Sequence, residues 1–434
     1  MNVRTRFAPS PTGPVHIGNI RVAIYNWLFA RNHNGSFLLR VEDTDHLRST
    51  PEAIQILLDT LNWLNISIDE EPLYQSTRIN DHLNVAEGLI QKGFAYRSKK
   101  GDAENGECIL FRMSDKAISF TDSIKGDLSK GADLIEDFVI VRSNGTPVFH
   151  LANVLDDIEQ GITHVIRGDD HVENTYKHIA LYQAMGAKVP IFAHLPMITN
   201  SNGKPYSKRD GDAFVGDFRK NGFLSDALFN YLALLGWSPG DDREILSRHE
   251  MIELFSLDRC QSSPAQVDIK KLTWINYEYM LQVPDHEFRV ALEKELKKDG
   301  IEYDKATLEK VIPLIRDRVK TFSDIAPLSR FLFQDDYQYN EKAVKKKLIR
   351  ENVKENLERL CKHFLEVEIF NADSLEHILH DFVESNEIGL AEIMPPLRVC
   401  VSGQQGGPDL CPVLELLGRE EVVHRIERAI EKFL

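Results

Sequence analysis

The first residues with evident chemical potential lie in the stretch RFAPSPTGPVHIGN, Arg6 to Asn19. Its prolines and glycines fix the backbone between an apolar strand and the helix that follows. His16 and Gly18 stand at the start of that helix, where free backbone N–H groups and the helix dipole attract phosphate. Gly18 would let a flat base lie against the backbone, and His16 would donate a hydrogen bond to phosphate oxygens as charge builds on them. Taken alone, however, such a stretch is also typical of a surface turn.

Acidic residues follow two further strands. LRVEDTD, residues 39–45, places three carboxylates at the end of an apolar strand, and VIRGDDH, residues 165–171, combines two more with Arg167. An arginine at the end of an apolar strand is costly to bury unless a carboxylate meets it. Because ligands of open α/β sheets bind at the carboxyl ends of the strands, these segments favour a polar binding site over ordinary loop exits.

The hydrophobic pattern predicts the elements that position these residues. VRTRFA and FLLRVE are expected to form buried strands, with a helix between them that Gly35 ends. The apolar residues of that helix recur at three- and four-residue steps: Ile20, Ala23, Ile24, Trp27 and Leu28. TPEAIQILLDTLNWLN predicts a second helix with Thr50 as its N-cap. Alternating strands and helices predict an α/β fold with a doubly wound parallel sheet.

The later part of the chain changes character. SDALFNYLALLG predicts a helix with Ser225 as N-cap, and after about residue 280 the chain is mostly helical. Its last segment carries acid–base pairs at helical spacing, such as Glu415 with Arg419. We therefore predict an α/β domain over residues 1–270, with a small insertion at about 80–150, followed by an all-α region over 271–434.

Composition narrows the class of protein. The chain has 434 residues, 42% hydrophobic residues and a net charge of −15, as expected of a globular protein of several domains. Its five cysteines are widely spaced, which argues against disulfides and a structural zinc site and favours a cytoplasmic protein. No segment is apolar enough to predict a membrane span, and no P-loop or dinucleotide fingerprint occurs.

The full string A-P-S-P-T-G-x-x-H-I-G resembles the signature of glutamyl-tRNA synthetases, class I enzymes with a HIGH motif. RVEDTD, FHLANVLDD and VIRGDDH resemble further segments of this family, and YSKR in the loop NGKPYSKRDGD resembles its second signature, KMSKS. By itself that loop is typical of a mobile surface turn. The resemblance implies a Rossmann-like catalytic domain, an insertion that binds the acceptor stem, and a helical anticodon-binding half.

The resemblance also implies roles for individual residues. The catalytic residues would be His16 and Lys208, with the lysine neutralising charge as pyrophosphate leaves. The ATP-binding residues would be Pro9, His16, Gly18, Asn19, Ser207, Lys208 and Arg209. The glutamate-binding residues would be Arg6, Ala8, Ser10, Glu42, Phe149, Asn153, Arg167 and His171. Among these, Arg6 and Arg167 would hold the two carboxylates of glutamate, and Glu42 its α-amino group.

The chain departs from the family's pattern at three positions. Asn19 replaces the second histidine of HIGH, and Phe149 stands where many members carry tyrosine. Pro205 replaces the first lysine of KMSKS, which leaves that lysine's role to Lys204 or unfilled. AYRSKKG, residues 95–101, lacks the paired cysteines that bind zinc in some relatives, so no metal site is predicted in the chain.

The expected activity is the ATP-dependent ligation of L-glutamate to the 3′ end of tRNA(Glu) through glutamyl-adenylate. ATP with Mg²⁺ is the expected cofactor, tRNA(Gln) is an alternative acceptor, and a monomer is expected. A shortened relative that glutamylates a nucleoside in tRNA lacks the anticodon-binding half, and glutaminyl enzymes carry P-P-E-P-N-G in place of APSPTG. A tRNA-binding paralogue with weakened catalysis is favoured only by Pro205 and Phe149.

Overall fold

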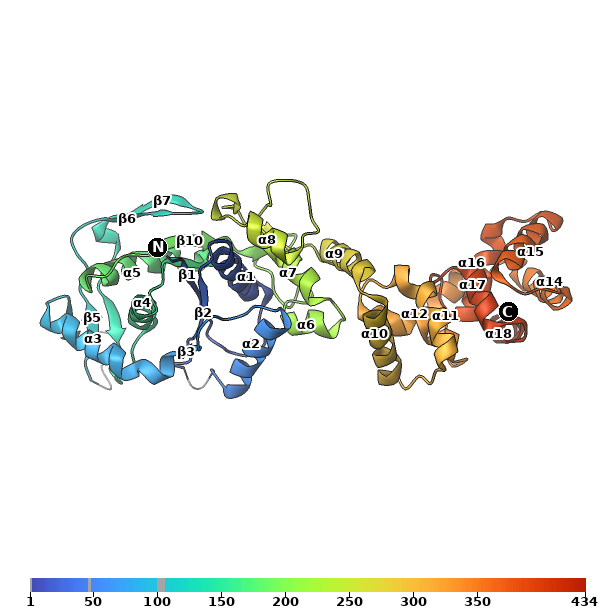
Figure 1. Cartoon of the computed structure of the whole chain (residues 1–434), viewed down its shortest axis with the longest axis horizontal. Coiled ribbons are helices and arrows are strands. Elements are labelled where there is room, and N and C mark those ends of the chain that lie inside the picture. Colours follow the sequence, from blue (N-terminus) through green and yellow to red (C-terminus); the bar gives the residue numbers. More distant parts are fainter. Residues whose placement is uncertain (1, 46–47, 100–105) are drawn as a thin grey trace. The chain divides into compact units, whose positions relative to one another are not determined.

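The computed structural model describes residues 2–45, 48–99 and 106–434. Residues 100–105, which belong to the predicted insertion and include the end of AYRSKKG, lie outside the described residues. Contacts between residues divide the chain into two compact units, Met1–Ile275 and Asn276–Leu434. The predicted α/β fold with a helical second part is confirmed (Figure 1).

Parallel strands form the centre of the first unit. β1 (Arg4–Phe7) is parallel to β2 (Ser36–Val41), which is parallel to β3 (Leu73–Tyr74), and β9 (His164–Gly168) is parallel to β10 (Ile191–Leu195). Hydrogen bonds between Arg4 and Thr163 join the start of β1 to the start of β9. The carboxyl ends of these strands consequently lie at one edge, where ligands of such sheets bind.

Helix α1 (Ile17–Asn32) crosses from β1 to β2 and is almost entirely covered. The apolar residues predicted for this helix are all buried. The remaining helices of this unit are α2 (Pro51–Trp63), α3 (Ile79–Gln91), α4 (Phe149–Glu159), α5 (Val172–Ala184), α6 (Val215–Lys220), α7 (Ser225–Leu234) and α8 (Arg248–Leu254). Thr50 caps α2 as predicted, since its side chain accepts a hydrogen bond from the amide of Ala53.

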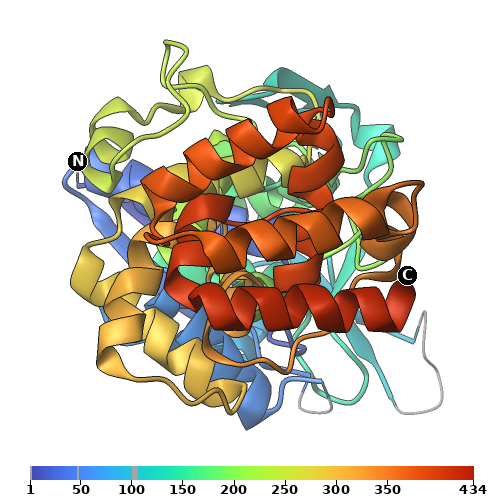
Figure 2. The same ribbon diagram turned by 90° about the vertical axis from the view of Figure 1, so that its right-hand side faces the viewer.

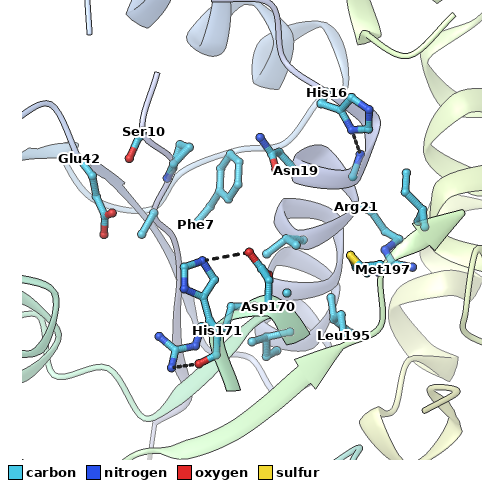
Figure 3. Close-up of a pocket in the computed structure, with 18 of the residues that line it drawn as sticks. Phe7, Ser10, His16, Asn19, Arg21, Glu42, Asp170, His171, Leu195 and Met197 are labelled. Atoms are coloured by element: carbon cyan, nitrogen blue, oxygen red, sulfur yellow. Dashed lines mark hydrogen bonds and ion pairs between the residues drawn. The ribbon is translucent and has the colours of Figure 1, made fainter. Parts of the chain in front are cut away.

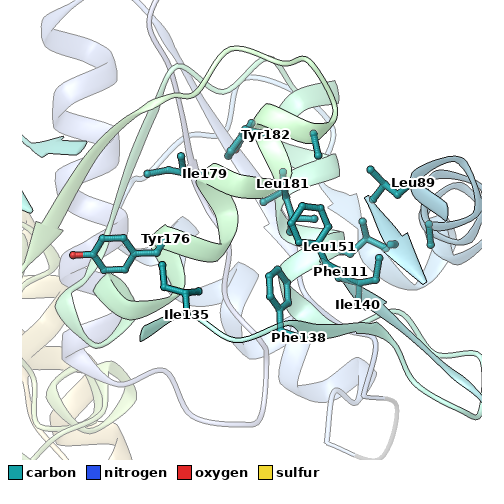
Figure 4. Close-up of a cluster of buried hydrophobic side chains, with 14 of the residues drawn as sticks. Leu89, Phe111, Ile135, Phe138, Ile140, Leu151, Tyr176, Ile179, Leu181 and Tyr182 are labelled. Carbon is teal, nitrogen blue, oxygen red and sulfur yellow. The ribbon is translucent and has the colours of Figure 1, made fainter. Parts of the chain in front are cut away.

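The predicted insertion contains two antiparallel parts. One is a small sheet of β4 (Ala95–Ser98), β5 (Cys108–Phe111) and β8 (Phe138–Val141). The other is the hairpin of β6 (Ile118–Asp122) and β7 (Gly126–Lys130), in which Asp122 pairs with Phe192 of β10. Buried side chains from α3, these strands, α4 and α5 form one apolar cluster (Figure 4). The insertion is therefore continuous with the α/β fold.

Two short strands, β11 (Ile198–Thr199) and β12 (Ala265–Gln266), pair with each other, and α9 (Ile269–Gln282) crosses the boundary between the units. The second unit is fully described and contains helices without strands (Figure 2). Its helices are α10 (Asp285–Lys298), α11 (Lys305–Ile315), α12 (Ile325–Phe333), α13 (Glu341–Ala343), α14 (Val353–Glu366), α15 (Ala372–Ser385), α16 (Leu390–Ser402), α17 (Leu410–Leu417) and α18 (Arg419–Phe433).

The predicted pair of Glu415 and Arg419 is wrong. Gly418 separates α17 from α18, so the two residues do not share a helix. Glu415 instead accepts a hydrogen bond from the amide of Ala372, and Arg419 donates to the carbonyl oxygen of Val367. The spacing of charges along the sequence could not reveal this break.

Candidate active site

A cavity of about 710 Å³ lies at the carboxyl ends of β1, β2, β9 and β10. Figure 3 shows Glu42 and Ser10 on one side of it and His16 and Arg21 on the other, with His171 between them. Most of the residues predicted for the site line this cavity: Arg6, Ala8, Pro9, Ser10, His16, Gly18, Asn19, Glu42, Phe149, Asn153, Arg167 and His171. Ser207, Lys208 and Arg209 do not line it, although their neighbours Pro205 and Tyr206 do.

Glu42 and Asn153 form a buried acceptor group at one end of the cavity. Nδ2 of Asn153 donates to Oε1 of Glu42 at 2.8 Å. The amide oxygen of the same side chain, Oδ1 of Asn153, is buried and has no hydrogen-bond partner among the described residues. Burial raises the pKa of Glu42, and the nearby Arg40 opposes this change. These oxygens suit a ligand that brings a donor, such as an ammonium group.

Arg6 is held by the last carboxylate of the segment FHLANVLDD, to which no role was assigned from the sequence. Nε of Arg6 donates to Oδ1 of Asp157 at 3.0 Å, and a nitrogen of Arg40 donates to the same oxygen at 2.5 Å. All three side chains are buried. Burial opposes the ionisation of Asp157, but Arg40 and Arg6 outweigh it and lower the pKa of this carboxyl group. Asp157 thus compensates two buried arginines, of which Arg6 lines the cavity.

Arg167 is buried among neutral partners. Its nitrogens contact Nε2 of His194 at 3.2 Å, Nδ1 of His178 at 3.3 Å and Oγ1 of Thr175 at 2.7 Å. Among the described residues no carboxylate forms an ion pair with it. Burial, followed by the charge of Arg6, lowers the pKa of Arg167 to about 9. Asp157 and Glu42 oppose this change from a distance, and the site holds a buried cation without a directly paired carboxylate, an arrangement that suits an anionic ligand.

Aromatic rings form part of the cavity wall near Arg167. Phe149, the first residue of α4, has its ring centroid 5.6 Å from that of His171 and 5.5 Å from that of His178. Burial lowers the pKa of His171, and the charge of Arg167 contributes to the same effect. A neutral and largely apolar wall thus lies beside the buried cation.

His16 lies at the start of α1, at the other end of the cavity. Its Nδ1 accepts a hydrogen bond of 3.1 Å from the amide of Gly18 and so caps α1. A side chain at position 18 would place its Cβ 3.2 Å from that ring nitrogen, so glycine leaves the helix start open. Burial lowers the pKa of His16, which favours the neutral ring. With Nδ1 accepting, the proton lies on Nε2, where the ring can donate.

The loop of residues 202–212, which carries Lys208, is stabilised by hydrogen bonds between polar residues. Asp210 accepts hydrogen bonds from Oγ and the amide of Ser207 and from Nδ2 of Asn200. The backbone at Pro205 forms a bridge with Thr199 of β11, which fixes the beginning of the loop. Lys208 and Arg209 are exposed.

Phe214 connects the loop with the helix start. The ammonium of Lys208 lies 6.0 Å from the centroid of the Phe214 ring, which in turn meets the His16 ring edge-on at 5.9 Å. A bridge between the backbones of His16 and Phe214 fixes this arrangement. The two predicted catalytic residues therefore both contact one aromatic ring.

Motif reading missed several residues that shape the site. The most important are Arg40, Asp157, His178, His194 and Phe214. Arg40 carried a usable signal, because a charged residue within the apolar run FLLRVE requires a buried partner. Asp157 is the last residue of FHLANVLDD, but nothing in that segment linked it to Arg6. His178, His194 and Phe214 come to the site only through tertiary structure.

Comparison with known families agrees with this geometry. The family described as tRNA synthetases class I (E and Q), catalytic domain, matches residues 2–105 and 97–274, and an anticodon binding domain matches residues 287–430. The fold, the site and these matches define a class I tRNA synthetase, a class that uses ATP.

Relatives refine this assignment. Glutamate–tRNA ligase 1 of Caldanaerobacter subterraneus is 37% identical, covering 99% of this chain and 98% of its own, and glutamate–tRNA ligase of Legionella pneumophila is 38% identical, covering 100% and 98%. The crystal structure of a glutamate tRNA ligase from Elizabethkingia meningosepticum in complex with its amino acid has a TM-score of 0.86 at 30% identity, with full coverage of both chains. The chain belongs to the glutamate–tRNA ligase family, which confirms the resemblance inferred from its motifs.

Two further findings concern the described residues only. None of their helices is long and apolar enough to cross a membrane. They also contain no group of three or more His, Cys, Asp or Glu residues arranged to hold a metal ion.

Proposed function

We propose that this chain joins L-glutamate to the 3′ end of tRNA(Glu) by way of glutamyl-adenylate. The observation that carries the proposal is the buried Arg167, which has neutral partners and lines the cavity beside Glu42 and Asn153. An amino acid with an extra carboxylate supplies both the anion that Arg167 lacks and the ammonium that suits the oxygens of Glu42 and Asn153.

In this proposal the glutamate lies at the end of the cavity formed by Arg6, Glu42 and Arg167. Ala8, Ser10 and Asn153 support it, and Phe149 and His171 exclude water from its side chain. Since Phe149 has no hydroxyl, its contribution is apolar contact. The amino-acid carbon chain is thereby held with its α-carboxylate toward the centre of the cavity.

ATP lies in the proposal against Pro9, Gly18 and Asn19, with its phosphates near His16. An oxygen of the glutamate α-carboxylate attacks the α-phosphorus, the bond to the β-phosphate oxygen breaks, and pyrophosphate leaves. Nε2–H of His16 stabilises the charge on the phosphate oxygens, and Lys208, with Ser207 and Arg209, closes over the departing pyrophosphate. The terminal ribose hydroxyl of tRNA then attacks the acyl carbon and releases AMP.

Mg²⁺ is proposed to enter with ATP. The carboxylates of the cavity wall are Glu42 and Asp170, of which Glu42 is assigned to the amino acid. This donor set does not form a metal site of its own, so the ion would be held mainly by phosphates and water. No zinc site, a monomer and a cytoplasmic location complete the proposal, the last supported by the unpaired cysteines.

Glutamate-dependent exchange between ATP and pyrophosphate tests the proposal, measured with and without tRNA. We expect exchange when tRNA(Glu) is present and little without it, as the family resemblance implies. Acylation of separate tRNA(Glu) and tRNA(Gln) transcripts then identifies the acceptor. Absence of exchange under every condition would refute the enzymatic function, and exchange without acylation of tRNA(Glu) would refute the acceptor.

A further inference from the structure

Buried hydrogen bonds run behind Arg167 from the inserted hairpin to the catalytic sheet. Nδ1 of His194 contacts Oδ2 of Asp122 at 2.6 Å, and Nε2 of His194 accepts from Nε of Arg167 at 3.2 Å. Asp122 is the last residue of β6 and His194 belongs to β10. The two side chains are buried, and neither lines the cavity.

Hydrogen-bonding rules assign the proton positions in this network. A guanidinium group only donates, so Nε2 of His194 has to accept. The proton of the neutral ring then lies on Nδ1, from which it is donated to Asp122. Burial lowers the pKa of His194 despite the opposing hydrogen bond to Asp122, in keeping with a neutral ring beside Arg167.

The orientation of Asp122 is fixed by the backbone. Its Oδ1 accepts hydrogen bonds from the amides of Ile124 at 2.9 Å, Lys125 at 2.9 Å and His194 at 3.1 Å. These three donors leave Oδ2 to face the imidazole. Asparagine at this position would keep its oxygen on the amides and turn its NH₂ group toward Nδ1 of His194. The ring would then carry its proton on Nε2, where it would oppose the N–H of Arg167.

We propose that Asp122 and His194 are positioning residues of the glutamate site. Asp122 selects the Nδ1–H tautomer of His194, and His194 in that form orients the guanidinium of Arg167 toward the substrate carboxylate. The inference rests on the proposed role of Arg167 in binding glutamate. It gives the inserted hairpin a part in amino-acid binding although the hairpin contributes no residue to the cavity wall.

Asp122→Asn tests the tautomer directly. In the tRNA-dependent exchange assay we expect the KM for glutamate to rise about tenfold or more, because a hydrogen bond to a charged group is lost, with a much smaller change in the KM for ATP. Nitrogen chemical shifts of labelled histidine, with His194 identified by the loss of its signal in His194→Gln, should show the proton moved to Nε2. Asp127→Asn, on the exposed side of the same hairpin, is the matched control.

Rescue separates tautomer control from simple support of the fold. In His194→Gln, the amide oxygen of the introduced side chain can accept from Arg167 whatever residue stands at position 122. Asp122→Asn should therefore raise the KM for glutamate only slightly when it is added to His194→Gln. The inference would be overturned if Asp122→Asn raised the KM for glutamate equally in the parent protein and in His194→Gln, or if it left the tautomer of His194 unchanged. If Asp122→Asn does not fold, His194→Asn, which removes the acceptor for Arg167, should raise the KM for glutamate more than His194→Gln, which keeps an acceptor. Equal KM values for the two variants would overturn the inference.

Arg167→Gln distinguishes this inference from the function on which it rests. If that variant leaves the KM for glutamate unchanged, the assignment of Arg167 to the substrate is wrong. If Arg167→Gln raises the KM and Asp122→Asn does not, only the positioning role is wrong.

Discussion

The guanidinium of Arg6 lies against the carboxylate of Asp157, with Nε 3.0 Å from Oδ1 and both side chains buried. Arg40 shares that oxygen, so one carboxylate compensates two buried cations. Removing one member of a buried ionic group leaves an uncompensated charge in the interior, which is far more costly than the loss of a surface pair.

Asp157→Asn should therefore lower the free energy of unfolding of the first unit by about 3 kcal/mol. It should also raise the KM for glutamate, because Arg6 loses the group that orients it. Urea unfolding followed by circular dichroism and the exchange assay measure the two effects. Asp241→Asn, which affects an exposed pair with Arg243, is the control and should change neither. An Asp157→Asn protein as stable as the parent would contradict the buried ion pair.

Arg167→Gln should reduce kcat/KM for glutamate by about 100-fold or more, since the substrate carboxylate would lose its charged partner. The KM for ATP should change little, because Arg167 lies at the end of the cavity that is proposed to hold the amino acid. Steady-state exchange kinetics with each substrate varied in turn provide the measurement. Arg243→Gln, at an exposed arginine, controls for the loss of a positive charge. Equal losses for both substrates would argue against a specific carboxylate site.

Lys208→Ala should lower kcat by about 100-fold with little effect on folding, because the exposed ammonium is proposed to act on charge that develops only as pyrophosphate leaves. Single-turnover formation of glutamyl-adenylate and thermal unfolding test the two parts. Lys220→Ala, at the exposed end of α6, is the control. A comparable loss in Lys204→Ala would assign the role of the first KMSKS lysine to Lys204, whereas full activity in Lys208→Ala would refute the motif assignment.

Acid pH should weaken glutamate binding through Glu42. Burial raises the pKa of this carboxyl group, and only the ionised form attracts the substrate ammonium. As pH falls through the raised pKa, Glu42 gains a proton and the KM for glutamate rises. The acid limb of kcat/KM for glutamate should thus lie above the range of an exposed glutamate and should disappear in Glu42→Gln. An unchanged acid limb in that variant would assign the titration to another group.

Gly35→Ala should destabilise the first unit by about 2 kcal/mol or more, since a methyl group there would lie 2.2 Å from the carbonyl oxygen of Val3. Gly88→Ala in α3 is a matched control, because nothing lies within 4 Å of its added methyl group. That substitution should raise the free energy of unfolding by about 0.5–1 kcal/mol. Thermal and urea unfolding measure both, and similar stabilities for the two variants would contradict the close approach at Gly35.

Gly35 also shows where sequence reasoning reached its limit. The glycine was predicted to end α1, but α1 ends at Asn32 and Asn34 has the left-handed backbone that follows it. Gly35 is required by contact with Val3, which no local pattern reveals. Similarly, the predicted cap Ser225 is the first residue of α7, and Leu224 precedes it without a capping side chain.

Residues with local signals were easier to find. The buried face of α1 follows from hydrophobic spacing, and His16 and Gly18 from the composition of a helix start. Asp157 belongs to the segment FHLANVLDD, but neither it nor His194 had a local signal for its partner, because each meets its arginine only when its helix or strand is packed in the fold. Periodicity predicts which face is buried, whereas the identity of a buried polar partner depends on contacts between distant segments.

The pairing of β6 with β10 has a consequence for protein engineering. A segment inserted in a catalytic domain could be regarded as an independent unit and replaced by the corresponding segment of a related enzyme. Here Asp122 of β6 is hydrogen-bonded to His194 inside the catalytic fold, and the cluster beneath the insertion includes residues of α4 and α5. A chimera that replaced residues 80–150 as a block would thus also replace part of the interior of its host. Even the β6–β7 turn is not independent of that interior, because the amides of Ile124 and Lys125 hold Asp122 in place.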